Sequence, residues 1–150
     1  MPEPTIIPVD NEHAHAAVGL LHRFFEEEGF ARDRAAISAN LEALRKAPHH
    51  WAAIAIGSGR AIGVVRVTAM LYVEWGRLGE IGDLYVLPEA RRRGVARALV
   101  RASLDWCRSQ GCSAVEVVLT ADGEAAHGLS RFYARFGFEP TGRTISLLHL

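Results

Sequence analysis

The residues with the most recognisable chemistry lie between Leu84 and Arg97, in the sequence LYVLPEARRRGVAR. A strand is expected to end at Pro88, a turn with arginines and Gly94 follows, and a helix begins at once. The first N–H groups of a helix have no acceptor within it, and with the helix dipole they attract anions. Gly94 lets the backbone approach an anion closely, and Ala96 keeps the first helical turn thin. The segment therefore predicts a phosphate-binding turn.

Other interpretations of this turn are an ordinary solvated helix start and a nucleic-acid patch at Arg91 to Arg93. The spacing matches neither GxGxxG nor the GK[ST] of a P-loop. The chain has 17 Lys plus Arg and 17 Asp plus Glu, so its formal net charge is zero. Without net positive charge or interleaved aromatic residues, nucleic-acid binding is disfavoured.

The turn resembles the pyrophosphate-binding motif of the GNAT superfamily of acetyl-CoA-dependent N-acetyltransferases. That motif has Arg or Gln, two residues, Gly, one residue, and then Gly or Ala, and Arg91, Gly94 and Ala96 occupy these positions. The resemblance covers about Leu78 to Gly142 and includes GEIGDLYV, AVEVVL and FYARFGF. The first half of the chain fits the family architecture but carries no family motif.

The resemblance implies acetyl-CoA as cosubstrate, held mainly by backbone groups. Leu84, Tyr85 and Val86 would pair with the pantetheine arm as a neighbouring strand does and would cradle the thioester oxygen. The residues implied in binding the pyrophosphate are Arg91, Arg92, Arg93, Gly94, Val95, Ala96 and Arg97.

Tyr133 is the residue that the resemblance implies as proton donor to the departing thiolate. A phenol with a pKa near 10 is protonated at neutral pH, which suits this role. Because Phe132, Tyr133 and Phe136 recur at helical spacing, plain core packing is the alternative.

Glu80 is the candidate for collecting the proton that the acceptor amine must lose. It lies six residues before Val86, where some GNAT members carry a glutamate base. Strand alternation is expected to place Glu80 on one face with Gly82, Leu84 and Val86, and Asp83 on the opposite face. Glu116 is the reserve candidate, a water chain is a third, and a surface or substrate-orienting role for Glu80 is the alternative.

One position departs from the family pattern. Many members carry an asparagine seven residues before the tyrosine, and Ala126 stands there, with His127 and Ser130 as candidate substitutes. Neither Cys107 nor Cys112 falls where the family's reacting centre lies, so direct attack by the amine is expected rather than an acetyl-enzyme. The cysteines form no CxxC, and the seven histidines show no ligand spacing, so no metal site is expected.

Periodicity and turn signals predict an α/β fold with a mixed central sheet of about seven strands and helices on both faces. Helices are expected from Asp10 or Asn11 to Gly29 and at about 33–46, 92–110 and 124–136. The strands are expected at 5–9, 51–56, 61–73, 79–87, 114–119, 138–141 and 144–148, with 51–56 and 61–73 forming an antiparallel hairpin.

Composition places the whole chain in one class. With 150 residues, 49% hydrophobic and 23% charged, a single globular domain over 1–150 is expected, and the resemblance implies that it is an N-acetyltransferase domain. No signal-like or membrane-spanning segment is evident, so a cytoplasmic protein is expected, with no membrane partner and a homodimer as an option.

The expected function is acetyl transfer to a primary amine of a small molecule or peptide. A cofactor-binding sensor or partner domain without turnover is the alternative. The sequence leaves the identity of the acceptor and the oligomeric state open.

Overall fold

The structure, a computed structural model, describes residues 2–150 of the chain. The chain divides into two compact units, one extending to Val118 and the other covering Leu119–Leu150.

The first unit is built on a five-stranded sheet whose strands are neighbours in chain order. Strands β1 to β4 pair antiparallel and β5 joins β4 in parallel, so the mixed sheet is confirmed. The left-handed backbone of Ser58 and Gly59 makes the turn of the expected β2–β3 hairpin. The strands are β1 (Thr5–Pro8), β2 (His50–Gly57), β3 (Arg60–Tyr72), β4 (Gly76–Val86) and β5 (Ala114–Val117).

The expectation of about seven strands was wrong, because residues 138–141 and 144–148 form none. The apolar residues near the C-terminus stay 71–81% exposed at Ile145, Leu147 and Leu148. A strand is stabilised by hydrogen bonds to a neighbouring strand and by burial of one of its faces. The segment 138–148 is apolar in part, but it is paired with no strand of the described chain and its apolar side chains from Ile145 on are exposed. An apolar pattern alone therefore overpredicted the sheet.

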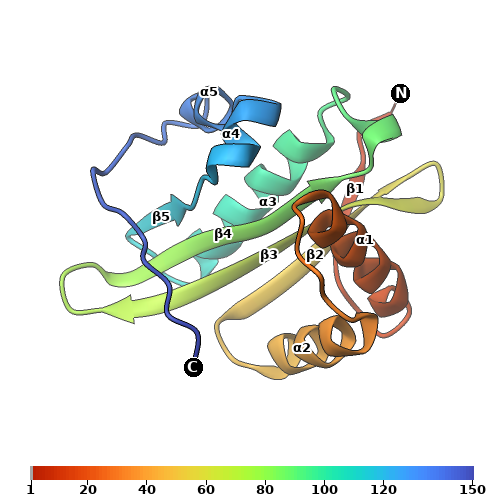
Figure 1. Cartoon of the computed structure of the whole chain (residues 1–150), viewed down its shortest axis with the longest axis horizontal. Helices are drawn as coiled ribbons and strands as arrows, with labels where there is room; N and C mark the ends of the chain where they lie inside the picture. The colour runs from red at the N-terminus through yellow and green to blue at the C-terminus, as the bar shows by residue number, and fades with distance from the viewer. Residues whose placement is uncertain (1) are drawn as a thin grey trace. The chain divides into compact units, whose positions relative to one another are not determined.

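Three helices cover the two faces of this sheet, as expected (Figure 1). Helices α1 (Ala14–Glu27) and α2 (Arg34–Lys46) lie on one face, and α3 (Val95–Ser109) lies on the other. On β3, a Cβ added at Gly63 would meet Leu99 and Val95 of α3, which marks the α3 face. The largest fully buried side chains between these layers are Ile54, Leu99, Val64, Val65, Val67, Val100, Cys107 and Ser103.

Helix α3 begins and ends at glycines with left-handed backbone. It starts at Val95 rather than at Arg92, because Arg92 and Gly94 have φ values of 61° and 81°. At its end, Gly111 has φ 76°, and the Cys112 N–H donates to the Cys107 carbonyl at 3.0 Å in a Schellman motif.

Two aromatic rings fix the far end of α3 against the sheet. The indole of Trp106 stacks on that of Trp51 in β2, with centroids 5.9 Å apart and planes 9° apart. The buried Sγ of Cys107 lies where a Cβ of Gly79 would be, which explains the glycine in β4. The C-terminal end of α3 is thus packed closely against β2 and β4.

In the second unit, the single helix expected at 124–136 is instead two short helices, α4 (Ala121–His127) and α5 (Leu129–Ala134). Gly128 lies between them with φ 60° and interrupts the helical backbone. The carboxylate of Glu124 accepts hydrogen bonds from the N–H and the hydroxyl of Ser130, at 2.7 and 3.0 Å, and so joins α4 to α5.

Glu27, in the last turn of α1, ties this helix to β4 and to the turn before α3. Its carboxylate accepts from the Tyr85 hydroxyl at 2.7 Å and from Nη2 of Arg91 at 2.9 Å. Burial alone would raise the pKa of Glu27, but the hydrogen bonds from Tyr85 and Arg91 and the charge of Arg91 outweigh it, so the pKa lies below its ordinary value of 4.5. The fold therefore favours the anion.

We expect Glu27→Gln to destabilise the protein in a pH-dependent way. Because the folded pKa is lowered, the contribution is present above about pH 4.5 and is lost as pH falls through the folded value. The Glu27 side chain is 41% exposed, so solvent screening limits the loss to about 1 kcal/mol at pH 7. Urea unfolding at pH 7 and at pH 3.5 measures it.

The matched control is Glu28→Gln, which makes the same change of charge one residue away. We expect it to alter the free energy of unfolding by less than about 0.5 kcal/mol at either pH. An equal, pH-dependent loss in both variants would mean that the net charge of α1, and not the contacts of Glu27, is responsible.

Candidate cofactor and acceptor site

Strand β4 changes its alternation at Asp83. Arg66 pairs with Gly82 and Val64 pairs with Tyr85, so Asp83 and Leu84 together face the single residue between Val64 and Arg66 on β3. Asp83 has a left-handed φ of 49°. This two-against-one pairing is a β-bulge, which bends the strand and turns the following side chains over.

The bulge corrects the expected placement of Asp83. Its Oδ2 accepts from Nε of Arg66 at 3.1 Å, and Oε1 of Glu80 accepts from Nη1 of the same arginine at 3.0 Å. Asp83 and Glu80 therefore lie on one face, and the prediction that they point apart was wrong. The bulge also undoes the predicted grouping of Glu80 with Val86, because Val86 pairs with Gly63 on the face covered by α3.

Beyond the bulge, one edge of β4 separates from β5. The parallel pairing runs from Leu78 opposite Ala114 to Ile81 opposite Val117, and in the described chain it goes no further. Because the Leu87 N–H donates to β3, antiparallel alternation turns the N–H and C=O of Val86 toward the open edge. The edge from Leu84 to Val86 is therefore not covered by β5, and its Val86 N–H is the group directed outward, because the Val86 carbonyl accepts from Nε of Arg91.

The turn between β4 and α3 has the shape of an anion site. A short 3-10 helix (Pro88–Ala90) leads into it, and Arg92 and Gly94 both have left-handed backbone. Such conformations turn successive N–H groups toward one point, and positive φ at a bulky residue costs about 1–3 kcal/mol, as is common at ligand sites. No side chain caps the start of α3 within the described residues, and the space beside Gly94 is open.

Arg91 does not extend into this open space. Its Nε donates to the Val86 carbonyl at 2.9 Å, its Nη2 binds Glu27, and its guanidinium lies 5.5 Å from the centre of the Tyr85 ring. The Arg91 side chain therefore fixes the turn to β4. Of the predicted residues, the exposed ones around the helix start are Arg92, Arg93, Gly94 and Arg97. These groups fit a pyrophosphate bound through backbone N–H groups.

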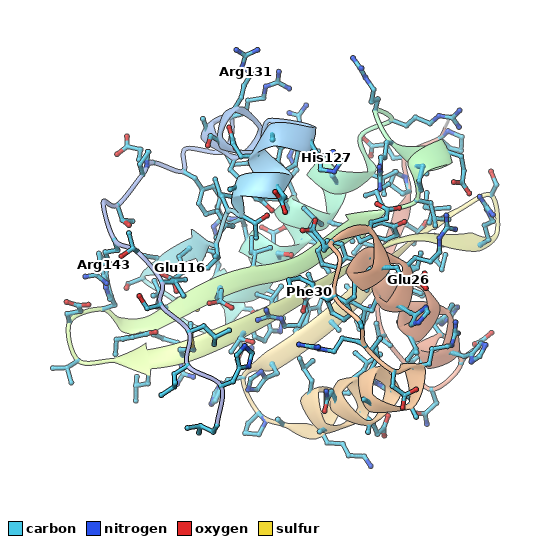
Figure 2. All side chains as sticks on the ribbon, in the orientation of Figure 1. Glu26, Phe30, Glu116, His127, Arg131 and Arg143 are labelled. Carbon is cyan, nitrogen blue, oxygen red and sulfur yellow. The ribbon has the colours of Figure 1, made fainter. Side chains whose placement is uncertain are left out.

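The carboxylates form a second group on β4. Glu80 and Asp83 are about one quarter to one third exposed, at 24% and 30%, and Arg66 is 25% exposed between them. Glu116, the reserve candidate for the base, is the parallel register partner of Glu80 on β5 (Figure 2). The first unit therefore brings together a proton acceptor candidate, its reserve and the open edge of β4.

Sequence reasoning missed Arg66, Asp83 and Glu27. A signal for Arg66 was present, because a charge inside a strand as apolar as AIGVVRVTA needs a buried partner. Glu27 belongs to the run Glu26–Glu28, and such runs are usually solvated, so nothing in the sequence distinguished it.

The thiol of Cys107 does not suit a nucleophile. Cys107 is fully buried, and burial, with a smaller contribution from Cys112, raises its pKa to about 12. A thiol with that pKa is protonated at neutral pH and is a poor nucleophile. This agrees with direct attack by the amine.

Tyr133, in the second unit, is 6% exposed and packs edge-on against Phe132 and Phe138, with centroids 5.0 and 5.4 Å away. Burial raises its pKa to about 12. The phenol therefore keeps its proton at neutral pH and is a hydrogen-bond donor.

The position of the absent family asparagine, Ala126, lies in α4. Of its candidate substitutes, Ser130 already donates its hydroxyl to Glu124, whereas His127 is exposed at the end of α4 (Figure 2). The His127 side chain is therefore the better placed of the two to contact a ligand.

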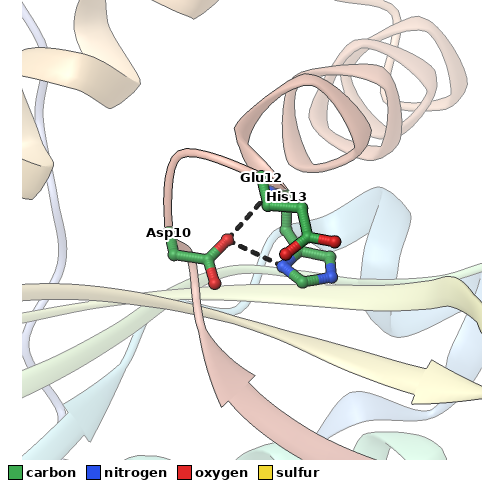
Figure 3. Close-up of side chains that lie close together, drawn as sticks. All are labelled: Asp10, Glu12 and His13. Carbon is green, nitrogen blue, oxygen red and sulfur yellow. Dashed lines mark hydrogen bonds and ion pairs between the residues drawn. The ribbon is translucent and has the colours of Figure 1, made fainter.

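Asp10, Glu12 and His13 form a further titratable cluster at the start of α1 (Figure 3). Oδ1 of Asp10 accepts from the His13 N–H at 2.9 Å and lies 2.7 Å from its Nδ1. Asp10 thus holds the turn that precedes α1, whereas the N-cap residue of the helix is His13 and no described side chain caps it, so the cap expected at Asp10 or Asn11 was wrong.

Among the described residues, no helix is both long enough and apolar enough to cross a bilayer.

Comparison with curated proteins finds N-acetyltransferases. The chain is 28% identical to aminoglycoside N(6')-acetyltransferase type 1 of Serratia marcescens over 113 residues, 71% of this chain and 75% of that enzyme. It is 40% identical to the same-named enzyme of Klebsiella aerogenes over 58 residues, 37% of this chain and 38% of the enzyme. With glucosamine 6-phosphate N-acetyltransferase 1 of Oryza sativa subsp. japonica it shares 33% identity over 84 residues, 56% of this chain and 47% of that one. The matches thus cover less than two thirds of the last two enzymes.

Comparison with solved structures supports the fold. The aminoglycoside N-acetyltransferase AAC(6')-Iy in complex with a bisubstrate analogue superposes with a TM-score of 0.85 at 24% identity, over 99% of both chains. Its complex with CoA gives a TM-score of 0.84 at 24% identity, over 97% of this chain and 94% of that one.

A family profile described as "Acetyltransferase (GNAT) family" matches residues 14–138. Since this match spans most of the chain, from α1 to the end of the FYARFGF segment, the protein belongs to the GNAT acetyltransferase family.

Proposed function

We propose that this protein transfers the acetyl group of acetyl-CoA to a primary amine of a small cationic acceptor, by direct attack of the amine on the thioester. One observation carries the proposal: β4 joins the uncapped start of α3, the open edge at Leu84 to Val86 and the carboxylates of Glu80 and Asp83. A cosubstrate chain bound along that edge would end near groups able to receive an amine.

Each residue has a separate task in this proposal. Acetyl-CoA supplies the acetyl group as an activated thioester. The N–H groups of Gly94 to Arg97 hold the pyrophosphate, and the Val86 N–H donates to the carbonyl oxygen where negative charge develops, an effect commonly worth about 3–4 kcal/mol. As the C–N bond forms, the proton of the attacking amine passes to Glu80, directly or through water.

Tyr133 is the proposed partner of the departing sulfur. Complete proton transfer from a phenol of pKa about 12 to a thiolate whose thiol has a pKa near 8.5 is uphill by roughly 3–4 pKa units. A strong hydrogen bond to the thiolate has no such cost. Tyr133 therefore stabilises the thiolate by hydrogen bonding, and the proton can follow from water.

The acceptor class follows from charge and from the relatives. Two carboxylates and one arginine give the acceptor side of β4 a net negative charge, which attracts an ammonium and repels a phosphate. The relatives named above include enzymes for aminoglycosides and for a sugar phosphate. The acidic group favours a polyamino sugar of the aminoglycoside class over a sugar phosphate.

The direct test is CoA release from acetyl-CoA with aminoglycosides, glucosamine 6-phosphate, polyamines and a peptide amine. We expect turnover with aminoglycosides and at least tenfold lower kcat/KM with the sugar phosphate. Gly94→Glu should abolish turnover and the thermal stabilisation by CoA, because it puts a charged side chain at the pyrophosphate position and strains a φ of 81°. Binding of CoA without turnover on any amine would support the sensor alternative.

Glu80→Gln keeps the shape of the side chain and removes its basicity. We expect kcat to fall by roughly 10²-fold at pH 7, with a deficit that shrinks at high pH, where more of the amine is already neutral. The measurement is the pH–rate profile of kcat with an aminoglycoside. An equal loss at every pH, confined to acceptor KM, would make Glu80 an anchor for the acceptor, and an unchanged rate would transfer the role to Glu116.

Tyr133→Phe removes one hydroxyl and keeps the aromatic ring. We expect turnover to fall by roughly 10²-fold while CoA affinity is retained, and a change in unfolding free energy of about 1 kcal/mol or less. Phe132→Leu, beside it on the helix, is the control for packing. Normal turnover of Tyr133→Phe under conditions where chemistry limits the rate would show that Tyr133 is only a core residue.

A further inference from the structure

Arg66 is a charged residue in the middle of the central strand β3, and it contacts three polar side chains. Its guanidinium donates to Glu80 at 3.0 Å and to Asp83 at 3.1 Å, and Nη1 also reaches Oγ1 of Thr68 at 3.3 Å. Nε and Nη1 donate to two different carboxylates, that of Asp83 in the bulge and that of Glu80 before it. One side chain thus connects the regular part of β4 to the residue where its alternation changes.

Gly82 makes this position of the guanidinium available. It is the register partner of Arg66, and the guanidinium lies where the Gly82 side chain would be. A Cβ added at Gly82 would collide with Nη2 and come within 2.6 Å of Cζ. Gly82 has no positive φ that would require glycine, so the close approach of Arg66 is the reason for the missing side chain.

The charges of the group depend on one another. Without Arg66, the partly buried carboxylates of Glu80 and Asp83 would lie on one face of β4, three positions apart, with no cation between them. Like charges at that range repel. Burial disfavours the charged form of Arg66, yet the charges and hydrogen bonds of Asp83 and Glu80 outweigh it and raise its pKa. The fixed fork of a guanidinium can bind two separate carboxylates, which the single ammonium of lysine does less well.

We propose that Arg66 is a positioning residue that lies across Gly82, gathers Glu80 and Asp83 on one face of β4, and thereby builds the acidic subsite that orients the acceptor amine. The inference rests on the proposed function for the identity of the ligand. The gathered subsite carries one net negative charge, so it selects acceptors with at least one ammonium besides the reacting amine. The test therefore includes a measurement that needs no turnover.

Gly82→Ala is the first variant, because it displaces the guanidinium and keeps every charge. With the full chain and an aminoglycoside, we expect acceptor KM to rise at least tenfold while the KM for acetyl-CoA stays within twofold. The matched control is Gly57→Ala in β2, whose new Cβ would meet the apolar side chain of Ile62, with Cδ1 at 2.5 Å. It should leave both constants within twofold.

Arg66→Lys and Arg66→Gln separate charge from geometry. We expect both to raise acceptor KM, Lys by less than Gln, and Gln to reduce the preference for acceptors with a second ammonium. Arg108→Gln, which breaks an exposed pair with Asp105 on α3, is the control for loss of one arginine. A loss confined to kcat, or equal losses for Arg66→Gln and Arg108→Gln, would overturn the positioning role.

Urea unfolding at pH 7 tests the coupling without turnover. Arg66→Gln should reduce the folding equilibrium constant by about tenfold alone and by less than about threefold in a Glu80→Gln, Asp83→Asn background. Additive losses would overturn the proposal even if acetyl transfer is observed. Coupled losses in a protein that acetylates no amine would keep the role of Arg66 in gathering the carboxylates and reject the proposed function. If Arg66→Gln does not fold, Arg66→Lys replaces it in the same comparison with the Glu80→Gln, Asp83→Asn background.

Discussion

The acidic group of Glu80 and Asp83 and the open edge from Leu84 to Val86 both depend on one local constraint, the left-handed backbone at Asp83. A shift of one residue in a strand moves every following side chain to the other face. Before the shift, Glu80 lies on the face of α1 and α2, while after it Tyr85 reaches α1 and Val86 faces α3. Because the strand bends at the same place, its edge leaves β5 and keeps backbone groups for another partner.

This constraint also explains why the turn before α3 is held so firmly. Tyr85 is on the α1 face only because of the bulge, and there its hydroxyl meets Glu27. Glu27 in turn holds Arg91, and Arg91 holds the Val86 carbonyl. The contacts close a ring through α1, β4 and the turn, so the arginine of the motif holds the turn in position and is not available to extend into the open space beside Gly94.

The parts of the site that sequence could predict are those set by neighbours in the chain. The turn at Arg91 to Ala96 combines a strand end, a glycine and a helix start, all local signals, and the hairpin at Ser58 and Gly59 is equally local. The face of Asp83 could not be predicted by alternation, because a bulge depends on a partner in another strand. In that strand, the Asp83 carboxylate finds its hydrogen-bond partner, Arg66, seventeen residues earlier in the chain.

The wrong predictions share the same physical origin. Periodicity over 124–136 is compatible with one helix, yet Gly128 at φ 60° ends it, since a glycine in a helix is only weakly penalised and its conformation is decided by packing. The apolar residues near the C-terminus satisfy the pattern of a strand but have no paired neighbour in the described chain, and pairing is a property of two segments. Sequence patterns therefore predict local turns better than they predict the edges of a sheet.

The stacked indoles of Trp51 and Trp106 give the protein an optical signature of its own. Parallel rings 5.9 Å apart interact electronically, so their near-ultraviolet circular dichroism depends on how α3 sits on β2. The fifteen residues of α3 make a rod of about 22 Å. Trp106 lies near one end of that rod, and the turn proposed to bind the pyrophosphate lies at the other. A ligand that tilts the helix would therefore change a circular dichroism signal that arises far from where the ligand binds. The third indole, Trp75 in the β3–β4 turn, is 42% exposed, so its fluorescence would be separate and sensitive to solvent.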